Sequence, residues 1–238
     1  MARQLAAALC LLTACSHRSD IRVSAAISLE PWLTGALADY RAAGGAPVEA
    51  SYGASGILEK QIAAGAPVAV FLSASPLEID GLGAAVAARK QIAGNRLVLA
   101  VSKDAVSLVH GPADLASPAI HRIAIGRPQS VPAGRYAQEA LEHLSLWQTL
   151  LPKLVFANHV AEVRAWVQRG EVEAGFVYAS EAAGLPAVIT LPGGPSVQIV
   201  AALLAAGDRP APAARGLYEF LTSPDRLPSL KAAGFSPP

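Results

Sequence analysis

From residue 21 onward, short runs of β-branched and aliphatic residues alternate with segments whose apolar positions recur every three or four residues. Leu33, Leu37 and Tyr40 fall on one face of a predicted helix, and a second helix is expected around 57–62. The flanking apolar runs predict strands at 21–24, 48–52 and 68–72. Because strands and helices alternate at short spacing, the chain is expected to form an open α/β sheet.

The same pattern restarts after an apolar strand predicted at 97–101, which follows a turn expected at Gly94-Asn95. The further strands are expected at 123–125, 154–156, 174–178, 188–190 and 198–201, and the further helices at 134–146, 160–169 and around 217–221. Since no Pro/Ser-rich linker separates the two units, the pattern favours two lobes joined by crossing strands. We expect lobe 1 to comprise 21–98 and 203–238, including the C-terminal helix, and lobe 2 to comprise 99–202.

Residues 1–20 have the pattern of a processing signal followed by a short polar tether. Arg3 is followed by an apolar stretch that ends in Leu12-Thr13-Ala14-Cys15, which resembles a bacterial lipobox. In that interpretation Cys15 is lipidated and anchors the protein in the cell envelope, with no other membrane contact. An ordinary secretory signal cut near Ala14 is the alternative. Either way, the mature chain lacks a pair of cysteines for a disulfide.

Composition and charge exclude two broad classes. Apolar residues make up 53% of the chain and the mean hydropathy is +0.38, but no apolar run approaches the 18 or so residues of a membrane span. The net charge is +1 and 16% of residues are charged, which is too balanced for a nucleic-acid-binding surface. We therefore expect no nucleic-acid partner.

Several strand-to-helix junctions have the features of an anion site. In the segment 131–137, Pro132 and Gly134 shape a helix start at which backbone N–H groups, such as that of Ala133, are free to meet a small anion. Ser28 and Ser55 follow predicted strands in the same way. Each serine has a plain alternative as a helix N-cap.

Two positions in the second unit complete this pattern. Val160 opens a helix after Asn158, a good N-cap, so its N–H is also free. Tyr178 ends a strand and presents a hydroxyl, although an ordinary strand-end tyrosine has the same pattern. His159 has no second histidine three or four residues away, so a surface position is favoured over a metal site.

The catalytic and cofactor-binding motifs that the chain approaches are all incomplete. Ser55 lacks the glycine two residues later that a nucleophile elbow needs, because that position is Ile57. The run Gly81-Leu82-Gly83 is not preceded by a predicted strand, so it does not fit a dinucleotide-binding loop. We expect neither an enzyme nor a bound cofactor.

Taken in order, these segments resemble those of the periplasmic molybdate-binding proteins, the solute receptors of ATP-driven importers. The segments that carry the resemblance are 25–29, 53–62, 65–67, 71–74, 131–137, 151–154 and 175–179. The resemblance implies a type II periplasmic binding protein fold, with two α/β lobes and a ligand cleft between them. It implies a monomer that closes on molybdate or tungstate and delivers it to an ABC transporter permease.

By the same resemblance, the oxyanion is held by five residues. They are Ser28, Ser55, Ala133, Val160 and Tyr178. The chain departs from the family at several positions, among them Arg127, which stands close to this predicted site. Three roles stay open for Arg127: its charge strengthens anion capture, it relaxes the selectivity between anions, or it forms an ion pair with Glu162. Arg135 is expected to be a solvated helix residue.

Three other functions stay open from the sequence. The first is a receptor for another tetrahedral oxyanion, such as sulfate or phosphate. The second is a serine hydrolase on the same fold, which needs a His or Lys close to Ser55, Lys60 being the nearest in sequence. The third is a lipid-anchored structural or sensory module that has lost ligand binding.

Overall fold

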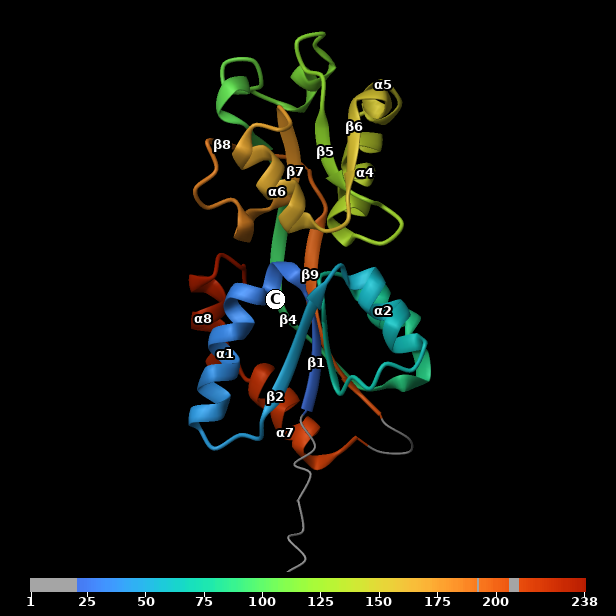
Figure 1. Ribbon diagram of the computed structural model, residues 1–238, viewed down its shortest axis with the longest axis vertical. Coiled ribbons are helices and arrows are strands. Elements are labelled where there is room, and N and C mark those ends of the chain that lie inside the picture. Colours follow the sequence, from blue (N-terminus) through green and yellow to red (C-terminus); the bar gives the residue numbers. More distant parts are fainter. Residues whose placement is uncertain (1–20, 192, 206–209) are drawn as a thin grey trace, which may run out of the picture.

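The computed structural model describes residues 21–191, 193–205 and 210–238, and these form two halves stacked end to end (Figure 1). Two strands, β4 (Val86–Val101) and β9 (Ser196–Leu204), run along the axis that joins the halves. The predicted signal segment and its Cys15 lie outside the described residues. Within the described residues, no helix is both long and apolar enough to span a membrane.

The first half is built on a sheet whose strand order is β2-β1-β3-β9-β4. The strands β1 (Ile21–Ala26), β2 (Val48–Gly53) and β3 (Val70–Ser73) are parallel, while β9 is antiparallel to both β3 and β4. All four residues of β3 are buried, as expected for a strand covered on both faces.

The second half continues from the same long strand. The last five residues of β4 pair with β7 (Ala174–Tyr178), and the last four of these also pair with β8 (Ala187–Thr190), both antiparallel. Beyond β7 lie β5 (Ile123–Gly126) and β6 (Leu154–Ala157), which run parallel to it and to each other. β4 therefore belongs to both sheets.

Helices follow the parallel strands in both halves. Their bounds are α1 (Glu30–Ala42), α2 (Ser55–Ala63), α3 (Pro76–Gly81), α4 (Pro132–His143), α5 (Trp147–Leu150), α6 (Val160–Arg169), α7 (Pro212–Leu221) and α8 (Leu227–Ala232). Helix α6 ends at Gly170, whose φ of 71° gives the left-handed cap that glycine favours. Helix α7 packs on β3, β9 and α1, so the C-terminal helix does return to the first half.

The expected strands and main helices are confirmed, but the turn predicted at Gly94-Asn95 is wrong. β4 passes straight through these residues, and Gly94 pairs with Gln198 of β9. Residues 86–96 were not expected to be a strand, and the charged residues among them, Arg89, Lys90 and Arg96, are exposed. What holds them extended is the pairing with β9, a hundred residues away along the chain. The short helices α3 and α8 were not expected either.

The pairing of β9 also bears on the division into lobes. β9 pairs with β3 and with residues 86–96 of β4, all in the first sheet. We therefore propose that the second segment of lobe 1 starts before Ser196, where the sequence pattern alone suggested residue 203.

Close packing of α4 on β5 depends on two glycines. A Cβ on Gly134, in the first turn of α4, would overlap the carbonyl oxygen of Gly126 at the end of β5. A side chain at either position would push the start of the helix away from the strand. The backbone N–H groups at this helix start are thus held at a defined distance from the sheet.

We expect Gly134→Ala to destabilise the fold by roughly 1–3 kcal/mol, because the methyl group overpacks a backbone contact that cannot rotate away. Chemical denaturation would measure the loss. Gly216→Ala in α7 is the matched control, since its Cβ would meet only the Tyr40 hydroxyl at 3.9 Å. An unchanged free energy of unfolding in Gly134→Ala would contradict the packing argument.

Candidate functional site

All five residues predicted to bind an oxyanion line one small cavity between the two halves. The first half contributes Ser28 and Ser55, and the second contributes Ala133, Val160 and Tyr178. The remaining lining residues are Ala26, Ile27, Gly53, Ala54, Ala74, Val131 and Pro132. The cavity is small, about 10 Å³, because the two halves are in contact around it.

The topology brings these residues together because each follows the carboxyl end of a parallel strand. Ser28 lies in the single 3₁₀ turn after β1, and Ser55 is the first residue of α2 after β2. Ala133 is in the first turn of α4, Val160 opens α6, and Tyr178 ends β7. In open α/β sheets, ligands bind at this edge.

The serine hydroxyls are not helix caps, which removes the plain alternative for both residues. Neither the turn at Ser28 nor helix α2 has a side-chain cap, and the N-cap residue of α2 is Ala54. The Ser28 Oγ is buried and has no hydrogen-bond partner within the described residues. The Ser55 Oγ accepts a hydrogen bond from the N–H of Ala74 at 3.2 Å, which leaves its own proton free to be donated.

Tyr178 is the third buried hydroxyl of the cavity. Its OH group also has no hydrogen-bond partner in the part of the chain that the structure describes. Burial raises the pKa of Tyr178 well above its usual value, so the group stays a neutral donor at physiological pH. A buried hydroxyl without a partner costs about 1–3 kcal/mol, which indicates that a ligand completes this site.

Two helix starts supply backbone donors. Ala133 and Val160 are first-turn residues, and the N–H groups of a first turn have no acceptor within their own helix. Asn158 was expected to be the N-cap of α6, but this was wrong. The cap is His159, whose Nδ1 accepts from the N–H of Glu162 at 3.2 Å, while the Glu162 carboxylate accepts from the N–H of Asn158 at 2.7 Å.

Among the residues that the structure describes, no charged side chain lines the cavity. It offers hydroxyl and N–H donors, and the helix starts add partial positive charge. Such a site suits a small anion that carries no proton, because there is no side-chain carboxylate to accept one. The donors are arranged so that they can bind such an anion.

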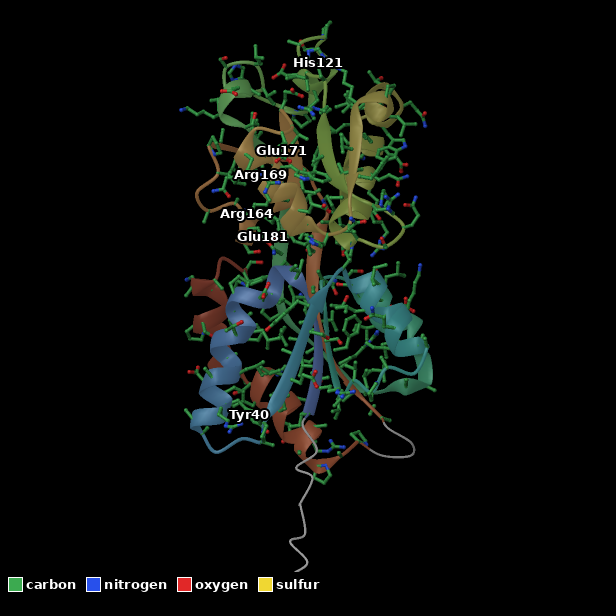
Figure 2. All side chains as sticks on the ribbon, viewed as in Figure 1. Tyr40, His121, Arg164, Arg169, Glu171 and Glu181 are labelled. Atoms are coloured by element: carbon green, nitrogen blue, oxygen red, sulfur yellow. The ribbon has the colours of Figure 1, made fainter. Side chains whose placement is uncertain are left out.

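A second, larger pocket of about 320 Å³ adjoins this cavity on the side of α1 and α6. Ser28, Glu30, Arg164 and Glu181 are among the residues that line it, and Figure 2 shows Arg164 and Glu181 close together where the second half faces α1. The Glu181 Oε2 is buried without a hydrogen-bond partner in the described chain. Burial raises the pKa of Glu181 to about 8, although the Arg164 charge acts in the opposite direction.

The sequence suggested that Arg135 is a solvated helix residue, but this was wrong. Its guanidinium donates to Glu78 Oε1 at 2.9 Å and to Ser75 Oγ at 3.1 Å, both in the first half. The Glu78 side chain is only 6% exposed and that of Arg135 is 24% exposed. The ion pair therefore ties α4 to α3 across the junction of the halves.

Arg127 does not pair with Glu162 in the described structure. Its guanidinium carbon lies 6.0 Å from the ring centre of Phe156, and the Glu162 carboxylate is occupied by the N–H of Asn158. Lys60 is exposed on α2, and the hydrogen bond recorded for Ser55 is with the N–H of Ala74. The arrangement thus offers Ser55 no base among the described residues.

Sequence reasoning missed the Arg135–Glu78 pair, although one signal was present. A positive charge in the first turn of a helix is unfavourable beside the helix dipole, so it needs an acidic partner elsewhere. Glu78 and Ser75 were not recognised as that partner because α3 itself was not expected. The unpartnered carboxyl oxygen of Glu181 had no sequence signal.

Comparisons with known proteins give consistent results. The model of a family described as bacterial extracellular solute-binding protein matches residues 21–236. The chain is 30% identical over 243 residues to the molybdate-binding protein ModA of Escherichia coli (strain K12), covering 94% of this chain and 91% of that protein.

Two further similarities cover different parts of the chain. It is 38% identical over 139 residues to YvgL of Bacillus subtilis (strain 168), named a putative ABC transporter substrate-binding lipoprotein; this match spans 57% of this chain and 53% of that protein. The solved periplasmic molybdate-binding protein of Azotobacter vinelandii aligns with a TM-score of 0.81 and 27% identity, over 92% of this chain and 100% of the other.

We expect Arg135→Gln to lower the free energy of unfolding by roughly 1–3 kcal/mol, because it leaves the nearly buried Glu78 carboxylate without its charged partner. Urea denaturation at pH 7 would measure this. The control is Arg169→Gln, whose partner Glu171 is about half exposed, so little change in the free energy of unfolding is expected there. Equal losses in the two variants would contradict the role of the Arg135 pair.

Glu181→Gln should change how stability depends on pH. The folded carboxyl keeps its proton up to about pH 8, whereas the unfolded carboxyl loses it near its ordinary pKa of 4.5. Between these values the folded state binds more protons, so Glu181 makes the wild type less stable as pH rises through this window. We expect the glutamine variant to gain roughly 2–4 kcal/mol relative to wild type between pH 5 and pH 8.5. Urea denaturation of both proteins at pH 5 and pH 8.5 measures this. The same difference in free energy of unfolding between the two proteins at both pH values would refute the prediction.

Proposed function

Because the chain belongs to the family of bacterial extracellular solute-binding proteins, we propose that it binds molybdate or tungstate outside the cytoplasm and delivers the anion to an ABC importer. The fold is that of the periplasmic binding proteins, as expected. The observation that carries the proposal is the small cavity between the lobes, where the Ser28 and Tyr178 hydroxyls come from opposite lobes and have no hydrogen-bond partner among the described residues.

The chemistry of the donors favours a fully deprotonated tetrahedral dianion. Each donor at the site is neutral, and no charged side chain lines the cavity. Molybdate and tungstate carry no proton at neutral pH, so every oxygen can accept a hydrogen bond. A protonated oxyanion such as monohydrogen phosphate would bring an O–H that finds no carboxylate acceptor in this lining, only hydroxyl oxygens, which lowers its binding free energy.

Five donors are enough for useful affinity. Hydrogen bonds to a charged group contribute roughly 1.5–3 kcal/mol each. Less the cost of desolvation and of closing the lobes, this corresponds to a dissociation constant in the micromolar range or below. Because the donors come from both lobes, binding favours closure, the usual movement of such two-lobed proteins.

The remaining elements of the proposal follow from a binding role. We propose that the protein acts as a monomer without cofactor or enzymatic activity, and that it contacts the ABC permease when loaded. We also propose that lipidation of Cys15 holds it at the cell envelope, supported by the lipobox-like sequence and by the lipoprotein name of the B. subtilis relative.

Calorimetric titration with molybdate, tungstate, sulfate and phosphate tests the proposed ligand. We expect binding of molybdate and tungstate, weaker binding of sulfate, and no binding of phosphate. No heat with molybdate or tungstate, confirmed by an unchanged melting temperature in their presence, would overturn the proposal. Tight binding of sulfate alone would assign the site to that smaller oxyanion.

Ser28→Ala, Ser55→Ala and Tyr178→Phe should each weaken molybdate binding about tenfold, the value of one hydrogen bond to a charged group. Ser28→Ala and Tyr178→Phe remove hydroxyls that have no partner within the described residues. The free energy of unfolding without ligand should therefore stay unchanged or rise in these two variants. The exposed Ser107→Ala is the control for binding. Wild-type affinity in all three variants would remove these side chains from the site.

A further inference from the structure

Gly56 marks the place beside the cavity where a backbone hydrogen bond joins the two lobes; the lobes also approach each other closely at Gly234 and Ser180. It lies in the first turn of α2, and its N–H donates to the carbonyl oxygen of Ser130, just before α4, at 3.1 Å. A Cβ on Gly56 would stand 2.7 Å from the oxygen, 3.1 Å from the Cα and 3.2 Å from the carbonyl carbon of Ser130. Since all three are backbone atoms, no rotamer change relieves the overlap.

The segment that carries Ser130 is firmly held by its own lobe. The N–H groups of Ser130 and Val131 both donate to the carbonyl oxygen of Arg127, at 3.1 and 2.9 Å. The N–H of Arg127 in turn donates to the carbonyl oxygen of Ala157, at the end of β6, at 2.8 Å. A side chain at position 56 would therefore be accommodated by moving the lobes apart.

The contact lies next to the cavity on both sides. Ser55, a predicted donor of lobe 1, directly precedes Gly56, and Ala133, a predicted donor of lobe 2, follows Ser130 by three residues. Any change in the distance between Gly56 and Ser130 therefore changes the distance between donors of the two lobes. Because the cavity is small and lined by residues of both lobes, such a change alters which donors can reach the same anion.

The Arg135–Glu78 ion pair, which joins α4 to α3, also favours the contact between Gly56 and Ser130. Arg135 stands five residues after Ser130 and binds Glu78 and Ser75 of lobe 1. The attraction between these groups draws the lobes together, and the backbones at Gly56 and Ser130 limit the approach.

We propose that the Gly56–Ser130 contact is the stop that limits closure of the lobes, and that Gly56 thereby determines the size of oxyanion that both lobes can grip. This inference rests on the proposed function. It predicts discrimination by size, because sulfate offers the same four acceptor oxygens as molybdate on a smaller frame. A cleft held slightly wider loses contact with sulfate first.

The test compares Gly56→Ala with wild type in calorimetric titrations with molybdate and with sulfate. We expect sulfate affinity to fall about tenfold more than molybdate affinity, because the smaller anion loses one hydrogen bond that the larger anion keeps. Gly35→Ala is the matched control: it also places Ala in a helix of lobe 1, but nothing lies within 4 Å of its Cβ. Its selectivity should equal that of wild type. Equal losses for both anions in Gly56→Ala, or no loss, would overturn the inference.

Amide hydrogen exchange of the ligand-free proteins gives a readout that does not depend on the ligand's identity. We expect residues 54–58 and 128–134 to exchange faster in Gly56→Ala than in wild type and in Gly35→Ala. Unchanged exchange would contradict the closure stop. If wild type binds none of the oxyanions, the proposed function fails, and the exchange result alone decides whether Gly56 limits closure.

Discussion

The antiparallel pairing of β4 with β9 is the constraint on which the rest of the structure depends. β4 is shared by both sheets: residues 86–96 pair with β9 in lobe 1, and residues 97–101 pair with β7 and β8 in lobe 2. Because one strand serves both sheets, the carboxyl edges of the parallel strands face each other across a narrow gap. Every donor of the candidate site lies on one of these two edges.

Buried donors without acceptors give this gap its chemical character. Ser75 and Ser223 accept from backbone N–H groups as helix caps, but Ser28 and Ser55 do not. The Ser28 and Tyr178 hydroxyls remain unpaired among the described residues, at a cost of about 1–3 kcal/mol each. In the proposed function, an anion that accepts from both lobes offsets that cost, which would couple binding to closure.

Closure also depends on groups that never touch the ligand. Arg135 and Glu78 attract each other across the junction, and both are largely removed from solvent, where an ion pair is less screened. Gly56 permits the backbones to meet because it has no side chain. In this proposal two contacts determine the width of the cavity. The ion pair between α3 and α4 draws the lobes together, and the backbone contact at the start of α2 limits how closely they approach.

Local sequence patterns determined the order of strands and helices and the five candidate donors. Apolar periodicity located β7 and α6 within their observed bounds, and the helix starts at Ala133 and Val160 follow from Pro, Gly and capping chemistry near in sequence. Such features depend on neighbours a few residues apart. The extension of β4 through Gly94-Asn95, the partner of Arg135, and the meeting of Gly56 with Ser130 were decided by the tertiary structure alone. Each depends on residues tens of positions apart, which only folding brings into contact.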